Sequence, residues 1–247
     1  MPTLFDFRFC IPSYQRADNQ PTLKLLAEYG VPKSRITIST QTEEDYEAYQ
    51  QRYGNLHQVV YYPKTNVSGN MNTLLDHRRL GTKIVFLDDD IKRISKLQPD
   101  GTLKDLDRNG FLTMLQTGFA LAKKHHTVGF GIYPVYNAFF MKHSYYKRAI
   151  CIATVLGVVN TLMRFDERIN TKQDYDFCCN AIKRYGAFIR LNDYAPDAAH
   201  YSRGGCEENW KDKEGVVADA NKLLHRYPDL LRRNPKRPGE VLMRKYE

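Results

Sequence analysis

The sequence lacks the features that mark secreted, membrane-spanning or zinc-organised proteins. Its five cysteines are odd in number and form no CxxC pair, which argues against a disulfide framework or a zinc ribbon. The longest apolar run, residues 149–159, is about half as long as a bilayer crossing requires. The N-terminal residues do not resemble a secretory signal, and no repeat of 20–50 residues is present. We therefore expect a cytoplasmic protein without a membrane partner.

Acidic residues are scarce relative to basic ones. The 247 residues contain 37 Lys and Arg but only 28 Asp and Glu, which leaves a formal charge of +9. Residues 221–247 hold eight basic and three acidic residues and thus supply more than half of this excess. Such a cluster suits a polyanion such as DNA, because neutralised phosphates release counterions. A solvated C-terminal surface explains the same charge. We predict one domain over residues 1–220, followed by a basic segment over residues 221–247.

The hydrophobic pattern predicts strands and helices that alternate. Strands are expected at 5–11, 36–40, 57–62 and 83–87, and helices at 22–29, 43–52 and 70–79. Farther along, we expect a helix at 111–124 and strands at 127–135 and 149–160. This alternation is typical of an α/β fold with a mostly parallel central sheet flanked by helices. Ligands of such sheets bind beyond the carboxyl ends of the strands.

Three carboxylates follow the buried-type strand 83–87 directly. Asp88, Asp89 and Asp90 repel one another unless a cation lies among them. In an extended chain, Asp88 and Asp90 point to one side and Asp89 to the other. A D-x-D pair of this kind suits Mn²⁺ or Mg²⁺, which prefer oxygen ligands and bridge to diphosphates. The alternative is a solvated acidic turn that Lys92 and Arg93 balance.

A second candidate site begins the helix expected up to Gly186. Cys178, Ala181, Ile182 and Tyr185 recur at helical spacing, so that Asp174 lies on the same inward face. A carboxylate there can act as a general base. Thr171, with an acid three residues later, is equally typical of a helix N-cap without catalytic function.

Other candidates carry weaker signals. His200, followed by Gly204 and Gly205, suits a metal ligand near a phosphate, although a lone histidine is more often structural. The segment 66–72 begins a helix and suits an anion or a ribose, although ordinary capping uses the same residues. Polar groups suited to a nucleotide also follow two other strands, at 13–16 and 40–43.

These motifs, in this order, resemble the GT-A fold of nucleotide-sugar glycosyltransferases over residues 7–205. The resemblance implies a metal held by Asp90 and His200, with Asp174 as the base of an inverting enzyme. It implies that Asp88 contacts the ribose. The remaining residues of the implied nucleotide site are Pro12, Ser13, Arg16, Thr40, Glu43, Gly69, Asn72 and Asp89. The family often has Glu-Asp where this chain has Gln173-Asp174.

Within that fold, the segments 11–16 and 86–91 resemble the small phage TET-associated glycosyltransferases. This resemblance implies transfer from a UDP-sugar to 5-hydroxymethylcytosine in double-stranded DNA, in the host cytoplasm if the protein is phage-encoded. The tail around Arg232, Arg233, Lys236 and Arg237 would then contact DNA. Three alternatives stay open: a protein or glycan acceptor, a non-catalytic nucleic-acid-binding module, and a metal-dependent nuclease or phosphatase.

Overall fold

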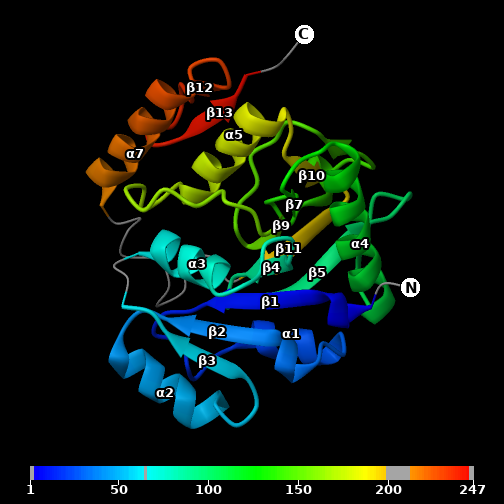
Figure 1. Ribbon diagram of the computed structural model, residues 1–247. Coiled ribbons are helices and arrows are strands. Elements are labelled where there is room, and N and C mark those ends of the chain that lie inside the picture. Colours follow the sequence, from blue (N-terminus) through cyan, green and yellow to red (C-terminus); the bar gives the residue numbers. More distant parts are fainter. Residues whose placement is uncertain (1–2, 64–65, 199–211, 245–247) are drawn as a thin grey trace.

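The computed structural model describes residues 3–63, 66–198 and 212–244, and its centre is an eight-stranded sheet (Figure 1). The strands follow the order β3-β2-β1-β4-β9-β7-β10-β8. They are β1 (Phe7–Pro12), β2 (Ile36–Thr40), β3 (Gln58–Tyr61), β4 (Lys83–Leu87), β7 (Gly129–Ile132), β8 (Tyr145–Tyr146), β9 (Val155–Val159) and β10 (Ile189–Leu191). β3, β2, β1 and β4 pair in parallel, whereas β9 is antiparallel to both β4 and β7. The expected α/β fold with a mostly parallel sheet is confirmed.

Helices and two smaller sheets complete the described chain. The helices are α1 (Pro21–Glu28), α2 (Glu43–Tyr53), α3 (Val67–Asp76), α4 (Arg108–Lys124), α5 (Gln173–Tyr185) and α7 (Lys213–Arg226). Short 3-10 turns are η1 (Leu4–Asp6), η2 (Lys33–Arg35) and η3 (Ala138–Phe140). The smaller sheets consist of β5 (Ile91–Leu97), β6 (Leu103–Asp105) and β11 (Tyr194–Ala198), and of β12 (Leu231–Arg233) and β13 (Val241–Met243). Among the described residues, no helix is long and apolar enough to cross a membrane.

The sheet is buried on both faces because successive side chains of its strands point to opposite sides. On β1, Phe9 and Ile11 pack into a cluster with residues of α1, α2 and α4. Cys10 points the other way, into a cluster with residues of α3, α5 and α7. The side chains of β4 alternate between the same two clusters. Helices on both faces thus leave the ends of the strands as the accessible part of the sheet.

Several expected strands are shorter than the pattern predicts, and β7, for example, covers only Gly129–Ile132 of the expected 127–135. Phe5 belongs to η1 and is 53% exposed, so that β1 begins only at Phe7. The strand expected at 149–160 is confined to Val155–Val159. The backbone N–H groups of Cys151 and Ala153 donate to side chains of α5, namely the Cys178 thiol and the Asp174 carboxylate, instead of joining a sheet ladder. This tethered segment precedes β9 and becomes part of the candidate site.

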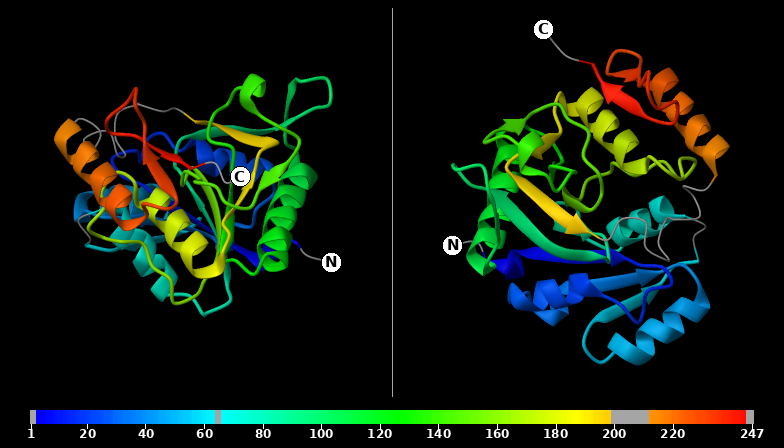
Figure 2. Two further views of the ribbon diagram at one scale, coloured as in Figure 1. Left: turned by 90° about the horizontal axis from the view of Figure 1, so that it is seen from above. Right: turned by 180° about the vertical axis from the view of Figure 1, so that it is seen from behind.

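The C-terminal residues pack against the rest of the molecule through α7. The expected boundary after residue 220 lies inside this helix. Ala220 and Leu223 are fully buried in the cluster that also contains Phe177 of α5. Figures 1 and 2 show α7, β12 and β13, in orange and red, beside α5. The basic hairpin β12–β13 is therefore held close to the start of α5.

Candidate functional site

The residues after β1 and the carboxylates after β4 lie at one edge of the sheet. β1 and β4 are parallel neighbours, with Phe9 opposite Val85, so their carboxyl ends meet there. Asp89 joins the two loops. Its carboxylate accepts a hydrogen bond from the Ser13 hydroxyl and a 2.5 Å charged hydrogen bond from Arg16 Nη1. The same Nη1 lies 3.2 Å from Asp90 Oδ2. Ser13, Arg16 and Asp89, all predicted from the sequence, thus form one network, in which Ser13 and Asp89 are buried and the Arg16 side chain is 12% exposed.

Helix α2 holds the loop after β1 in place. Its Asp45 and Tyr49 are one turn apart and face the loop. The Asp45 carboxylate accepts from the backbone N–H of Gln15, which has the positive φ of 53°. The Tyr49 hydroxyl accepts from the backbone N–H of Arg16 at 3.2 Å and lies 2.5 Å from Ser13 Oγ. Asp45 and Tyr49 are four residues apart and therefore lie on one face of α2. This spacing is visible in the sequence, but we did not predict from it that the two side chains support the loop after β1.

We expect Tyr49→Phe to lower the free energy of unfolding by about 1–2 kcal/mol, because the fully buried hydroxyl serves several partners. Gln20 Nε2, which donates to that hydroxyl at 3.0 Å, would lose an acceptor. Urea unfolding measures the change. Tyr46→Phe, on the half-buried side of the same helix, is the matched control and should stay within about 0.5 kcal/mol of the parent. Equal stability of the two variants would contradict the supporting role of Tyr49.

Thr22 of α1 fixes the turn that carries the three carboxylates. Its hydroxyl donates to the carbonyl oxygen of Asp88 at 2.7 Å and accepts from the backbone N–H of Ile91 at 2.9 Å. The hydroxyl therefore bridges the two ends of the turn between β4 and β5. The carboxylates are held by the fold before any ligand binds.

Asp88 and Asp174, far apart in sequence, are anchored to two consecutive residues. The backbone N–H of Asp88 donates to the Thr154 carbonyl at 3.2 Å, and that of Ala153 donates to Asp174 Oδ2 at 3.0 Å. Burial, together with the negative charges of Asp90, Asp89 and Asp174, raises the pKa of Asp88 to about 7, and the hydrogen bond from Thr154 opposes this rise. Burial also raises the pKa of Asp174 to about 6, although the N–H groups of Ala153 and Tyr175 stabilise its charged form. Two buried carboxyls with raised pKa values therefore lie in one site.

Asp90 fits a metal ligand. Its Oδ1 atom is buried and has no hydrogen-bond partner, while Oδ2 is the atom close to Arg16. The three carboxylates and Asp174 outnumber the single guanidinium bound to them, so the site favours an added cation. The described ranges contain no group of three His, Cys, Asp or Glu side chains placed to hold a metal. His200, the other expected ligand, lies outside the described residues.

The other predicted nucleotide-site residues lie around this edge with different exposures. Pro12 ends β1 and pairs with Ser39, and Glu43 is exposed at the start of α2. Thr40 is buried, with its hydroxyl 3.4 Å from the Val60 carbonyl. These positions stay predictions as nucleotide contacts.

The start of α3 supports a neighbouring loop. Gly69 donates its N–H to the side chain of Asn66, the N-cap. The Asn72 amide donates to the Phe165 carbonyl at 3.0 Å and accepts from the Phe165 N–H at 2.8 Å. Both predicted residues are thus engaged with protein groups in this structure. Their assignment to the nucleotide remains a prediction.

The start of α5 differs from the expected capping. Lys172 is the N-cap residue, and the Thr171 hydroxyl donates to Asp219 of α7 rather than capping α5. Four residues of the expected inward face are buried as predicted: Asp174, Cys178, Ala181 and Ile182. The fifth, Tyr185, is instead 38% exposed. The fully buried Lys172 ammonium lies 3.3 Å from the carboxylate of Glu240, in the turn before β13. This ion pair attaches the C-terminal hairpin two residues from Asp174.

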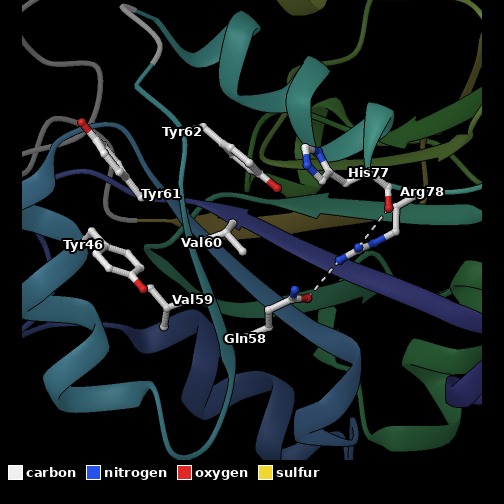
Figure 3. Close-up of a pocket in the computed structure, with 8 residues that line it drawn as sticks. All are labelled: Tyr46, Gln58, Val59, Val60, Tyr61, Tyr62, His77 and Arg78. Carbon is white, nitrogen blue, oxygen red and sulfur yellow. Dashed lines mark hydrogen bonds between the residues drawn. The ribbon is translucent and has the colours of Figure 1, made fainter.

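A pocket of about 540 Å³ lies elsewhere, along the edge strand β3 (Figure 3). Tyr46, Tyr62, His77 and Arg78 are among its lining residues, and Arg78 donates to Gln58 at 3.1 Å. None of the predicted site residues lines it. The pocket is therefore distinct from the carboxylate site at the ends of β1 and β4.

Most of the chain matches the profile of a known family. A profile of the TET-associated glycosyltransferases matches residues 7–205, which include every element of the carboxylate site. The chain belongs to this family. The expected family and the enzyme class, glycosyltransferase, are thereby confirmed at the level of the family. A search of curated proteins found no match.

Solved glycosyltransferase structures share the fold of this family member. The mannosyltransferase PcManGT from Pyrobaculum calidifontis, in complex with GDP-Man and Mn²⁺, has a TM-score of 0.60 at 14% identity. That match covers 91% of this chain and 66% of that one. TarS 1-349 of S. aureus has a TM-score of 0.52 at 15% identity, covering 88% of this chain and 65% of that one. A second TarS structure contains UDP, with the same TM-score and coverage at 14% identity. The chain thus spans about two thirds of these proteins.

Proposed function

We propose that the protein transfers a sugar from a UDP-sugar to the hydroxymethyl group of 5-hydroxymethylcytosine in double-stranded DNA. The observation that carries this proposal is the anchoring of Asp88 and Asp174 to the adjacent residues Thr154 and Ala153. It brings the carboxylates at the end of β4 next to a second buried carboxylate. A nucleotide-sugar donor bound at the carboxylates after β4 would then present its anomeric carbon to an acceptor located at Asp174.

In this proposal, Asp174 takes the proton of the attacking hydroxyl. Its raised pKa, about 6, is close to the operating range of a general base near neutral pH. Asp88 contacts the ribose, and Arg16 and Ser13 keep Asp89 and the turn in place. Asp90, with its free Oδ1, and His200 hold Mn²⁺ or Mg²⁺, which when bound neutralises charge on the leaving diphosphate. The solved structure of PcManGT, which shares the fold, is a complex with GDP-Man and Mn²⁺.

The C-terminal hairpin supports DNA as the acceptor. Arg232, Arg233, Lys236 and Arg237 are exposed on it or on its turn. The Glu240–Lys172 ion pair fixes that turn next to the start of α5. The exposed cations therefore belong to a hairpin that an ion pair attaches two residues from the proposed base. Phosphates of an acceptor duplex would reach them while the modified base approaches Asp174.

Intact-mass analysis of a short duplex tests the proposal. A duplex with one 5-hydroxymethylcytosine is incubated with the protein, Mn²⁺ and each of several UDP-sugars. We expect a mass increment of one sugar for a UDP donor, lost with EDTA and absent from an unmodified cytosine duplex. Release of UDP without an increment on DNA would overturn the DNA acceptor and retain the donor. Transfer from GDP-mannose alone would overturn the UDP assignment. No reaction with any donor, or cleavage of the duplex, would overturn the enzyme proposal.

A further inference from the structure

A long stretch of the sequence contains no acidic residue. Residues 108–165 include neither Asp nor Glu. They carry seven basic residues, which are Arg108, Lys123, Lys124, Lys142, Lys147, Arg148 and Arg164. This stretch thus has a formal charge of +7, separately from the basic hairpin, and all the acidic residues that bring the whole chain to +9 lie elsewhere. Three of these basic residues, Lys142, Lys147 and Arg148, follow β7 closely in the sequence, whereas Arg164 pairs with Asp76.

Within this stretch, residues 133–148, here called the aromatic segment, expose large apolar side chains. Phe139 and Phe140 of η3 are 86% and 55% exposed. Their rings contact each other edge to face, with the ring centroids 5.0 Å apart. The Asn137 side chain caps η3 by accepting from the Phe139 N–H at 3.0 Å. In Figure 2 (left), the green loop after β7 extends beyond the strands of the sheet. Exposed neighbouring aromatics on a capped turn are typical of a binding surface.

The aromatic segment is held firmly at its base. The Tyr133 N–H donates to the Tyr194 carbonyl at 2.9 Å, and the Lys142 N–H donates to the Asn192 carbonyl at 3.1 Å. Met141, directly after η3, is buried. The two phenylalanines are therefore presented by an ordered loop, which lowers the entropy cost of binding through them.

The aromatic segment starts at the same edge of the sheet as the carboxylate site. β4 and β7 are both antiparallel to β9 and therefore run in the same direction. The loop after β7 leaves the sheet at the same edge as Asp88–Asp90 after β4, two strand positions farther out, with β9 between the two strands. The carboxylate site occupies the β1–β4 half of this edge, and the aromatic segment leaves the sheet on the β7–β10 half. Its last residues run back antiparallel to β10, so that Tyr145 contacts His125 and Lys147 lies toward the amino end of that strand.

Charge decides which partner fits this surface. Lys142 and Lys147 are exposed and form no ion pair among the residues that the structure describes. The carboxylate that interacts electrostatically with His143 belongs to Asp193. Its Oδ2 atom already lies 3.8 Å from the ammonium nitrogen of Lys96. A symmetric contact with a second copy would place the same cations opposite one another, which disfavours it. A nucleic-acid strand offers both phosphates for the lysines and bases for the aromatic rings.

We propose that the aromatic segment binds the DNA acceptor, with Phe139 and Phe140 stacked against bases and Lys142 and Lys147 on phosphates. This inference rests on the proposed function and names the surface that this function would use. Aromatic stacking on a base contributes about 1–3 kcal/mol, and apolar side chains act as wedges between base steps in other DNA-binding proteins. The segment then complements the basic hairpin from the other side of the carboxylate site.

Fluorescence anisotropy of a labelled duplex containing 5-hydroxymethylcytosine tests this inference. We expect the double variant Phe139→Ala, Phe140→Ala to raise Kd at least tenfold with an unchanged salt dependence. The double variant Lys142→Ala, Lys147→Ala should reduce the slope of log K against log salt by about two. UDP release to water from the donor should stay at the parent rate in both. Leu162→Ala, at a position 82% exposed outside the segment, and Lys24→Ala are the matched controls.

Two further results keep the tests separate. Phe139→Tyr retains a ring and should bind as the parent, whereas Phe139→Leu should bind more weakly; equal affinity for both would overturn base stacking. Parent-like binding by the double phenylalanine variant, while sugar is still transferred to DNA, would overturn the inference and leave the proposed function intact. Failure of the parent itself to bind or modify DNA would instead refute the proposed function. A dimer that dissociates in the phenylalanine variant, with DNA affinity unchanged, would assign the surface to a second copy.

Discussion

Replacing Asp90 with asparagine is expected to lower sugar transfer by more than about a hundredfold while the fold stays intact. The variant removes the carboxylate whose Oδ1 is buried and without a partner, and with it the ligand proposed for the divalent ion. Loss of several kcal/mol of charge stabilisation at the diphosphate corresponds to a factor of this size or larger. Transfer rates measured over a range of Mn²⁺ concentrations give the result, and added metal should not restore the parent rate.

The melting temperature of the Asp90 variant distinguishes loss of the metal ligand from loss of the fold. The charge of Asp90 raises the pKa of Asp88, so its removal relieves repulsion, and we expect an unchanged or higher Tm. Asp18→Asn is the matched control, because that side chain is 96% exposed and pairs with Arg52 at the surface. Full activity of the Asp90 variant, or an equal loss in both variants, would refute the metal assignment.

Replacing Asp174 with asparagine is expected to lower the transfer rate by about 10²–10⁴-fold and to change its pH dependence. A base acts in its deprotonated form, and burial raises the pKa of Asp174 to about 6. The parent rate should therefore fall as the pH drops below about 6 and level off above it. The variant should lose this acidic limb. Transfer rates measured between about pH 5 and pH 8 at saturating donor compare the two profiles.

The control for this variant is Asp76→Asn, whose 60% exposed carboxylate pairs with Arg164 away from the site. It should retain both the rate and the acidic limb of the parent. UDP release to water, which needs no DNA acceptor, should fall less in the Asp174 variant than transfer does. A variant that transfers sugar slowly but keeps the limb near pH 6 would show that another group is the base, and Asp174 would then only position the acceptor.

The sequence determined most of the sheet and the place of the acidic motif. The strands expected at 36–40 and 83–87 have the predicted bounds, because the first is a short β-branched run and the second a mostly apolar run that ends directly at Asp88. Alternation along β1 predicted side chains on two faces, and the structure places Phe9 and Cys10 in separate clusters. The position of Asp88–Asp90 at the end of β4 also follows from local order alone. These features depend on residues close together in the chain.

The tertiary structure alone decided how the site is assembled. Asp88 and Asp174 come together because β9 inserts antiparallel beside β4 and brings residues 153–154 with it. Hydrophobic periodicity cannot specify this pairing, since it reports which face of a strand is buried and not which strand lies beside it. For the same reason the supports from Thr22 and Tyr49 were not predicted: each acts on a loop that is distant in sequence. Local pattern encodes the elements of this glycosyltransferase, whereas long-range packing brings its carboxylates together.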